Sequence, residues 1–340
     1  MIILKKVKIG LIGLGSMGSI HLSNCIKMKN VEVIAVADKS KRTLRYAKNI
    51  GIKNIYTDYE EIIKDKNIDA LIISLPNFLH KDCAIAAAEA GKHIFIEKPL
   101  ARNILEGEEI RTSIEHSDVK GMVGYPLRFD KQYIDIKADI ENGIFGAVIT
   151  ASTSNISSGP FSSRGQLGRP VPVPSWWFDK ELLGGGALLD LGVHSVNLFR
   201  YYFGDVIETH SQLGYRFNMD LEDHAVCIMK FKSGTLATIK VGWFSSDIIR
   251  SLEINGTIKN ISFTKSSPSK LKIISSDIKK KLGLTNEHNS FFHEINYFID
   301  CLNLDIQPIP SVDEGLMDLK IISEAYNNQF GKNSNVLIRD

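Results

Sequence analysis

The fold of this chain is decided by one stretch near its start, Val7-Lys8-Ile9-Gly10-Leu11-Ile12-Gly13-Leu14-Gly15-Ser16-Met17-Gly18. Its apolar first half predicts a strand, its second half is a complete G-x-G-x-x-G, and residues 19–28 predict a helix. In this pattern Gly13 allows a tight turn, Gly15 lets the backbone approach a pyrophosphate, and Gly18 lets helix and strand pack closely. The helix N-terminus then offers free N–H groups to the anion. The stretch therefore predicts a dinucleotide-binding unit.

An acidic residue follows at the distance that this pattern requires. Residues 31–37 predict the second strand, and Asp38 ends it about twenty residues after the last glycine. A carboxylate there accepts hydrogen bonds from the adenosine ribose and repels a 2′-phosphate, which favours NAD. NADP stays open because Lys39, Lys41 and Arg42 would neutralise a phosphate if they turned inward. A solvated helix start is the simpler interpretation of these three cations.

The alternation of strands and helices continues along the first half of the chain. Strands are expected at 69–74, 93–96 and 122–124, and the loop at 75–80 opens a helix that ends near Gly91. This alternation predicts a parallel sheet with helices on both faces, which is a doubly wound Rossmann fold.

A lysine follows one of these strands, in the run His93-Ile94-Phe95-Ile96-Glu97-Lys98-Pro99. Ligands of a doubly wound sheet bind outside the carboxyl ends of its strands, so Lys98 is expected beside a nicotinamide. The alternative is a surface lysine in a turn. Asn77 and His80 are expected at the same edge. Their alternatives are helix capping for Asn77 and a solvent-facing ring for His80.

Composition and charge indicate the class of protein. The 340 residues are too many for one ordinary core, so we expect two domains, 1–124 and 125–340, with the final segment free to pack back on the first. The net charge of +2 indicates no broad basic surface for nucleic acid. The four cysteines are far apart and are expected to be reduced. We see no secretory leader and no apolar run long enough for a bilayer, and expect a cytoplasmic protein without a membrane partner.

The second half contains a long stretch rich in Gly, Ser and Pro, residues 156–175, which includes Arg164 and Arg169 and runs into Trp176-Trp177-Phe178. A long loop of this kind is usually a lid, a binding loop or a disordered segment. We expect Trp176 or Trp177 to stack on a sugar face, and Arg164 or Arg169 to reach a hydroxyl, a carboxylate or a phosphate; bidentate arginine recognition suits an anionic group. The alternatives are core tryptophans, surface arginines or a contact with a neighbouring subunit.

A triple glycine, Gly184-Gly185-Gly186, precedes a helix expected at 187–203. Most of its residues are apolar, but Asp190, His194 and Asn197 lie at i, i+4 and i+7 and predict one polar stripe. Burying such groups without hydrogen-bond partners costs roughly several kcal/mol, so the stripe must face water, a polar partner or a ligand. A structural Asp–His pair is the alternative. The glycines would let another group approach the helix start closely.

Alternating strands occupy residues 206–263, with Ser233-Gly234 at a hairpin turn, and helices are expected at 130–142, 289–303 and 313–328. This pattern predicts an α+β domain with a large, mostly antiparallel open sheet, one face of which packs on helices. The other face still carries aliphatic side chains, which indicates contact with another subunit.

Four runs and the closing region together resemble one known family. The most specific is Ala90-Gly91-Lys92-His93-(x)3-Glu97-Lys98-Pro99. The others are Gly13-x-Gly15-x-x-Gly18, Gly124-Tyr125-Pro126-Leu127-Arg128-Phe129, Gly184-Gly185-Gly186-Ala187-Leu188-Leu189-Asp190-Leu191-Gly192-Val193-His194 and residues 310–326. They resemble the glucose–fructose oxidoreductase / inositol dehydrogenase / rhizopine catabolism family, the Gfo/Idh/MocA oxidoreductases. Residues 159–177 match no family-wide pattern, so substrate identity does not carry over.

The resemblance implies a set of site residues and an assembly of several copies of this chain. Catalytic roles are implied for Lys98, His194 and Asp190. Cofactor contacts are expected from Gly13, Gly15, Ser16, Met17, Gly18, Asp38, Asn77, His80 and Glu97. Substrate contacts are expected from Lys98, Tyr125, Arg128, Asp190, His194 and Trp177, and no metal is expected. The resemblance also implies a cis Lys98–Pro99 bond, which for X–Pro costs about 0.5–1 kcal/mol, and a homodimer or homotetramer formed through the second-domain sheet.

The activity implied is an NAD(P)-dependent dehydrogenation of a sugar, cyclitol or sugar derivative. His194 is expected as general acid/base, because an imidazole titrates near neutrality. Lys98 would stabilise the developing alkoxide and Asp190 would orient a hydroxyl. The choice of proton donor between Lys98 and His194 stays open. Two other classes stay open as well: a dinucleotide-sensing regulator without chemistry, and an enzyme that uses tightly bound NAD transiently, such as a nucleotide-sugar oxidase or glycosidase.

Overall fold

The computed structural model describes residues 6–161, 173–217, 219–267 and 290–330. The chain forms two compact units. The first consists of Met1–Lys131 with His288–Met317, and the second of Gln132–Glu287 with Asp318–Asp340. The loop arginines Arg164 and Arg169 lie outside the described residues, as does the rest of 162–172.

The first unit is built on a parallel six-stranded sheet with the order β3-β2-β1-β4-β5-β6. Its strands are β1 (Val7–Ile12), β2 (Val31–Ala37), β3 (Asn54–Tyr56), β4 (Ala70–Ile73), β5 (His93–Glu97) and β6 (Gly121–Gly124). The order reverses between β1 and β4, which is where ligands bind in such sheets. The predicted doubly wound sheet is confirmed.

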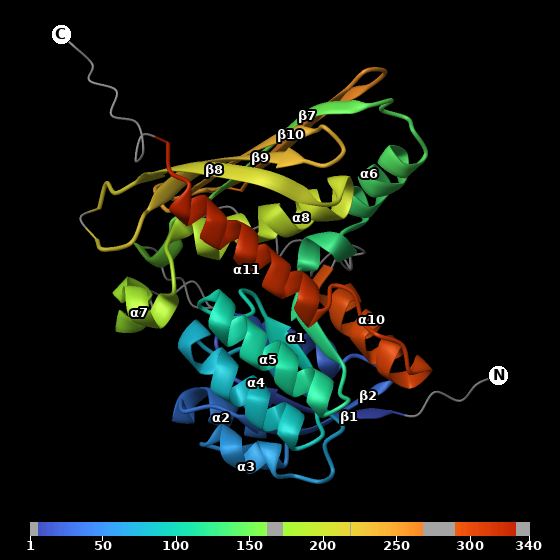
Figure 1. The fold of residues 1–340 in the computed structure, drawn as a ribbon. Coiled ribbons are helices and arrows are strands. Elements are labelled where there is room, and N and C mark those ends of the chain that lie inside the picture. Colours follow the sequence, from blue (N-terminus) through green and yellow to red (C-terminus); the bar gives the residue numbers. More distant parts are fainter. Residues whose placement is uncertain (1–5, 162–172, 218, 268–289, 331–340) are drawn as a thin grey trace. The chain divides into compact units, whose positions relative to one another are not determined.

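Helices cover both faces of this sheet. They are α1 (Ser16–Cys25), α2 (Lys41–Asn49), α3 (Tyr59–Ile63), α4 (His80–Glu89), α5 (Ile104–His116) and α10 (Ser290–Leu304), with short 3-10 turns η1 (Asn77–Leu79) and η2 (Pro126–Phe129). On one face α4 packs between α3 and α5 (Figure 1). The other face holds one buried cluster that joins α1, α2 and α10 to alternate residues of the strands, such as Ala70 and Ile72 of β4. Because alternate side chains of a strand point to opposite faces, strands that are apolar along their whole length supply apolar side chains to both faces of the sheet.

The second unit contains a six-stranded sheet with the order β12-β11-β7-β10-β9-β8. Its strands are β7 (Val148–Ile156), β8 (Val206–Gly214), β9 (His224–Phe231), β10 (Leu236–Gly242), β11 (Ile248–Gly256) and β12 (Asn260–Ser267). The pairs are antiparallel except β7 with β10, which is parallel. The expected hairpin turn lies between β9 and β10, where Gly234 has φ +91°. The mostly antiparallel open sheet is therefore confirmed.

The helices of the second unit include α6 (Lys131–Glu141), whose first residue belongs to the first unit, and α8 (Val193–Phe203), which packs on β10 of the sheet (Figure 1). The others are α7 (Lys180–Leu183), the last part of α11 (Val312–Asn327), and short turns η3 (Gly159–Phe161) and η4 (Ser175–Phe178). The boundary between the two units falls within α11.

The helix expected at 187–203 is regular only in its second part. Residues Leu188–Gly192 form a π turn, η5, which contains Asp190. The predicted polar stripe is also divided. The Asn197 side chain is buried and donates to the Asp318 carboxylate at 2.7 Å, whereas Asp190 and His194 are partly exposed. The three side chains therefore do not share one exposed surface, because Asn197 faces a buried polar partner while the other two reach the surface.

Within the described residues, one helical segment, Lys180–Phe203, is long and apolar enough to cross a membrane by length and composition alone, with a mean hydropathy of 1.3 over its most apolar 18 residues. The expectation that no apolar run reaches this length is therefore wrong. Because 72% of its most apolar window is buried inside the protein, the segment also has the character of a core helix in a soluble protein.

The fold makes Asp318 a stability determinant of the second unit. Its fully buried carboxylate accepts hydrogen bonds from Asn197 at 2.7 Å and from Arg200 at 2.6 Å. Asp318→Ala should lower the free energy of unfolding by about 3–5 kcal/mol, because it removes a buried carboxylate that accepts from both a guanidinium and an amide. Asp139→Ala, which removes an exposed ion pair with Lys259, is the control and should cost about 1 kcal/mol or less. Equal effects in urea unfolding would contradict this assignment.

Candidate active site

The glycine loop of the first unit has the geometry that its sequence predicts. Gly13 has φ +83°, and a Cβ on it would overlap the Ser74 carbonyl oxygen. A Cβ on Gly18 would overlap the Gly13 carbonyl oxygen, so only glycine allows α1 to pack this closely on the end of β1. Gly15 is exposed, and a Cβ there would meet no atom within 4 Å. The surface at Gly15 is therefore open to an approaching ligand.

Asp38 ties this loop to the end of β2. Its Oδ2 accepts a hydrogen bond from the Leu14 backbone N–H at 2.5 Å, and its Oδ1 accepts one from Ser40 at 2.6 Å. The carboxylate is partly exposed, so it remains accessible to a ribose. Lys39 and Arg42 are exposed at the start of α2, as the interpretation of a solvated helix start predicts.

These residues fit a dinucleotide. The N-cap of α1 is Gly15, and in the described structure it provides no side-chain cap for the first N–H groups of the helix. Ser16 is exposed and Met17 partly exposed in the first turn. A pyrophosphate can accept from N–H groups at such a terminus, where the helix dipole favours negative charge. Asp38 would bind the adenosine ribose.

Lys98 follows β5 and is partly exposed, and the Lys98–Pro99 bond is cis, as expected. Next to it, His80 links two loops. The ring Nδ1 lies 2.9 Å from the Pro99 carbonyl oxygen, and Nε2 lies 2.9 Å from that of Leu75. The ring is fully buried, and burial lowers the pKa of His80. The alternative of a solvent-facing ring is therefore wrong, while a cofactor contact of His80 stays a prediction.

The other residues expected at this edge differ in exposure. Asn77 is partly exposed and begins η1, and neither η1 nor α4 has a side-chain cap at its N-terminus in the described structure. Both interpretations of Asn77, a helix cap and a cofactor contact, stay predictions. Glu97 points inward, and its Oε1 lies 2.6 Å from His21 Nε2. Tyr125 is 1% exposed, and Arg128 is paired with Glu314 at 2.5 Å. Their contacts with cofactor or substrate stay predictions.

In the second unit, Asp190 is held by two groups. Its backbone N–H donates to the Gly186 carbonyl at 3.0 Å, and its Oδ2 accepts from the indole N–H of Trp243 at 3.1 Å. His194 follows in the first turn of α8 and is partly exposed. π turns of this kind are frequent at functional sites. The structure thus places an acid and an imidazole on the same short segment, with the acid oriented by a buried indole.

Further aromatic rings pack next to the indole that orients this acid. Trp243 is fully buried, and Trp177 packs edge-on against it with ring centroids 6.2 Å apart. Trp177 also stacks on Trp176 at 5.0 Å. Gly159, with φ +49°, lies so close to Trp243 that a Cβ would overlap the indole ring. The described ends of the predicted lid therefore pack against the residue that orients Asp190. Trp177 as a substrate contact stays a prediction.

The triple glycine has the purpose that its sequence predicts, the close approach of another group. That group is Glu222, whose carboxylate accepts from the backbone N–H of Gly186 at 3.1 Å and of Leu188 at 3.0 Å. The hydroxyl of Tyr326 donates to the same carboxylate at 2.7 Å. A Cβ on Gly186 would overlap the Glu222 carbonyl. Burial raises the pKa of Glu222, while these donors oppose the rise.

Sequence reasoning missed Glu222 and Trp243, which bond to the segment of Asp190 in the second unit, and His21 and Glu294, which lie next to Glu97 in the first unit. None of them stands at a spacing that marks a motif. Trp243 is 53 positions from its partner Asp190, and Glu222 is 36 positions from its partner Gly186. Only the unusual types, a histidine and a glutamate within otherwise apolar segments, could have drawn attention to His21 and Glu294.

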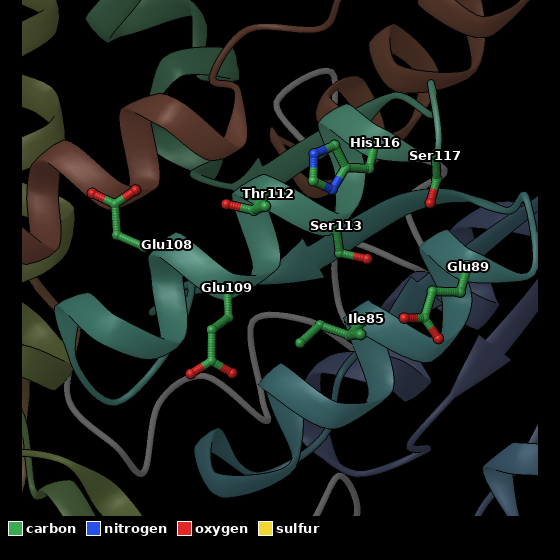
Figure 2. Close-up of a pocket in the computed structure, with 8 residues that line it drawn as sticks. All are labelled: Ile85, Glu89, Glu108, Glu109, Thr112, Ser113, His116 and Ser117. Carbon is green, nitrogen blue, oxygen red and sulfur yellow. The ribbon is translucent and has the colours of Figure 1, made fainter.

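A surface hollow of about 420 Å³ lies elsewhere on the first unit. Figure 2 shows its lining from α4 and α5 and the residue after α5, with Glu108 and Glu109 near one end and His116 and Ser117 near the other. None of its lining residues belongs to the glycine loop or to the Lys98 turn. We assign it no part in the chemistry.

An open glycine loop with an acid at the end of the second strand defines a dinucleotide-binding Rossmann fold. Residues 7–125 match the oxidoreductase family with an NAD-binding Rossmann fold, and residues 133–262 match the GFO/IDH/MocA C-terminal domain. The chain belongs to the Gfo/Idh/MocA oxidoreductases, as its motifs predicted, and it is an enzyme of that family.

Several similar proteins are named as dehydrogenases of an inositol or of levoglucosan. The chain is 30% identical over 243 residues to myo-inositol 2-dehydrogenase of Thermotoga maritima, and the match covers 68% of this chain and 67% of the relative. It is 28% identical over 338 residues to scyllo-inositol 2-dehydrogenase (NAD(+)) of Bacillus subtilis, covering 95% and 94%. A solved levoglucosan dehydrogenase in complex with NADH and levoglucosan shares the fold, with a TM-score of 0.78, 22% identity and coverage of 95% and 96%.

The glycine loop predicts a contrast between two small substitutions. Gly15→Ala should leave the melting temperature unchanged but weaken NAD binding tenfold or more, about 1.4 kcal/mol, because its methyl group occupies the phosphate approach. Gly18→Ala should lower both stability and affinity, because its methyl group overlaps the Gly13 carbonyl. Thermal unfolding and NAD titration measure the two effects. Normal NAD affinity in Gly15→Ala would remove this loop from the cofactor site.

Proposed function

We propose that this enzyme transfers a hydride between nicotinamide and a secondary hydroxyl or carbonyl carbon of a sugar, cyclitol or sugar derivative. The observation that carries the proposal is the Asp190 carboxylate, oriented by the Trp243 N–H one turn before His194. Such a pair suits a substrate with neighbouring hydroxyls, one of which loses its proton while another is held. The fit of the glycine loop to a dinucleotide supplies the redox partner.

The roles divide among three residues. Bound NAD supplies the hydride acceptor. His194 takes the proton of the reacting hydroxyl in oxidation and returns it in reduction. Lys98 places a positive charge where an alkoxide develops, which lowers the pKa of the hydroxyl. Asp190 accepts a hydrogen bond from a second hydroxyl and so fixes the orientation of the ring.

The aromatic surroundings of Asp190 support a ring-shaped substrate. Indole faces are large, rigid and apolar, while the indole N–H remains a donor, so they suit molecules with one apolar and one polar face. Trp177, at the described end of the 159–177 segment, is in contact with the buried Trp243. The inositol and levoglucosan dehydrogenases among the relatives are named for substrates of this shape.

The proposal includes an assembly and a compartment. On β9, alternate side chains face outward, with Val226 41% and Ile228 40% exposed, and Leu236 of β10 is 47% exposed on the same face. We propose that this face forms a homodimer or homotetramer, which light scattering after size exclusion would measure.

The proposed compartment is a reducing cytoplasm. It is supported by the four cysteines, which are buried free thiols.

The proposal requires that Lys98 and His194 contribute to the rate of the chemical step and not to NAD binding. Lys98→Met and His194→Ala should each lower kcat by about 10²–10⁴-fold, the usual contribution of a proton-transfer or electrostatic group. The Kd for NAD should stay within about threefold, because the glycine loop and Asp38 hold the cofactor. A screen of cyclitols, aldoses and sugar acids, followed at the nicotinamide absorbance, provides the substrate. Near-normal kcat in both variants would refute the assignment.

Cofactor preference follows from Asp38. The enzyme should prefer NAD over NADP by at least tenfold in kcat/KM, about 1.4 kcal/mol, because the carboxylate opposes a 2′-phosphate. Steady-state rates with both cofactors measure this. Preference for NADP would contradict it, and the variants Lys39→Ala and Arg42→Ala would then identify the cation that binds the phosphate.

A further inference from the structure

Three buried ionisable side chains meet inside the first unit. They are His21 of α1, Glu97 of β5 and Glu294 of α10, and one ring nitrogen and two carboxylate oxygens lie within 4.8 Å of one another. His21 and Glu294 are fully buried, and Glu97 is 7% exposed. The proposed chemistry of the site uses neither His21 nor Glu294. Glu97 directly precedes Lys98, so the cluster lies next to a residue of that site in the chain.

The cluster has a deficit of positive charge. His21 Nε2 lies 2.6 Å from Glu97 Oε1, which is a direct hydrogen bond. Neither oxygen of Glu294 has a hydrogen-bond partner among the described residues. The surroundings are aromatic, with the Phe95 and Phe291 rings 5.4 Å and 6.2 Å from the imidazole. Two carboxylates this close in an apolar site cannot both remain ionised without a cation.

The charged groups on the neighbouring elements are engaged elsewhere. On η2, which packs on α10, Arg128 forms an ion pair with Glu314. On α10 itself, Asp300 accepts from Asn30 and Asn296, and His293 is exposed. From α1 and β5, His21 and Glu97 face Glu294 directly. Burial raises the pKa of Glu294 well above its usual range, and the nearby Glu97 carboxylate raises it further.

We propose that Glu294 is a neutral carboxylic acid in the folded enzyme at neutral pH, and that it is a positioning residue for Lys98. Its proton leaves Glu97 as the single anion of the cluster, so the Glu97–His21 hydrogen bond persists. Because Glu97 is the last residue of β5, this bond fixes the backbone from which Lys98 extends. The positioning role rests on the proposed function of Lys98, whereas the protonation does not.

The protonation is tested by stability against pH in the apo-enzyme. The raised pKa means that the folded state binds one more proton than the unfolded state, above the unfolded glutamate pKa of about 4.3. Wild-type stability should therefore fall with rising pH, relative to Glu294→Gln, by tenfold in the unfolding equilibrium constant per pH unit until the folded pKa is reached. At pH 7 Glu294→Gln should be more stable than the wild type.

A matched control is Glu106→Gln, another buried glutamate of the first unit. Glu106 is paired with Arg102, so this variant should be less stable than the wild type rather than more. Parallel pH profiles of wild type and Glu294→Gln would overturn the protonation. So would a divalent cation that remains with the purified wild type and whose removal by a chelator lowers its melting temperature but not that of Glu294→Gln.

The positioning role is tested by kcat with a substrate found in the screen. Glu294→Gln cannot ionise and leaves Glu97 as the single anion of the cluster, so at neutral pH it should retain kcat within about twofold. Wild-type kcat, measured relative to that of Glu294→Gln, should fall tenfold or more as rising pH ionises Glu294, with the Kd for NAD unchanged. Parallel kcat–pH profiles of the two proteins would overturn positioning. Failure of the proposed function appears separately, as normal kcat in Lys98→Met, and leaves the stability result intact. Reduced kcat in the folded Glu294→Gln variant at neutral pH also overturns the role.

Discussion

The first unit depends on the contact between Gly18 and the carbonyl oxygen of Gly13. No side chain fits between them, so the first turn of α1 comes down directly on the end of β1. The same turn leaves Gly15 facing outward and brings the Leu14 N–H to within 2.5 Å of the Asp38 carboxylate. One missing methyl group therefore brings together a helix N-terminus, an exposed glycine and a carboxylate, the three features of the proposed cofactor site. The chemistry proposed at the Lys98 turn requires that this arrangement hold the cofactor.

The second unit uses a glycine in the same way but for another purpose. Gly186 has no room for a Cβ because Glu222 approaches it, and the Glu222 carboxylate accepts from the first N–H groups of the segment. Anchored there, the chain makes a π turn before α8 begins. Asp190 lies within that turn, and the Trp243 N–H fixes its carboxylate. The wider π turn places Asp190 where an α-helix would not.

Much of the fold could be predicted because local signals and global topology agree. The glycine fingerprint, the acid after β2 and the alternation of elements each predict the parallel sheet. The partners of the site residues could not be predicted, since they come from distant parts of the chain. Trp243 is 53 residues from Asp190, and Asp318 is 121 residues from Asn197. Helical spacing alone grouped Asn197 with Asp190, because an apolar pattern does not distinguish a π turn from an α-helix.

Buried acids show how differently this chain compensates charge. Asp318 is matched by a guanidinium, Glu222 by two backbone N–H groups and a tyrosine hydroxyl, and Glu97 by an imidazole. In each of these cases the compensating group belongs to the chain and is present whenever the protein is folded. In our proposal Glu294 has only a proton, which exchanges with solvent. The strand end that carries Lys98 would then rest on a compensation whose occupancy depends on pH, which would link the ionisation state of the interior to the geometry of the site.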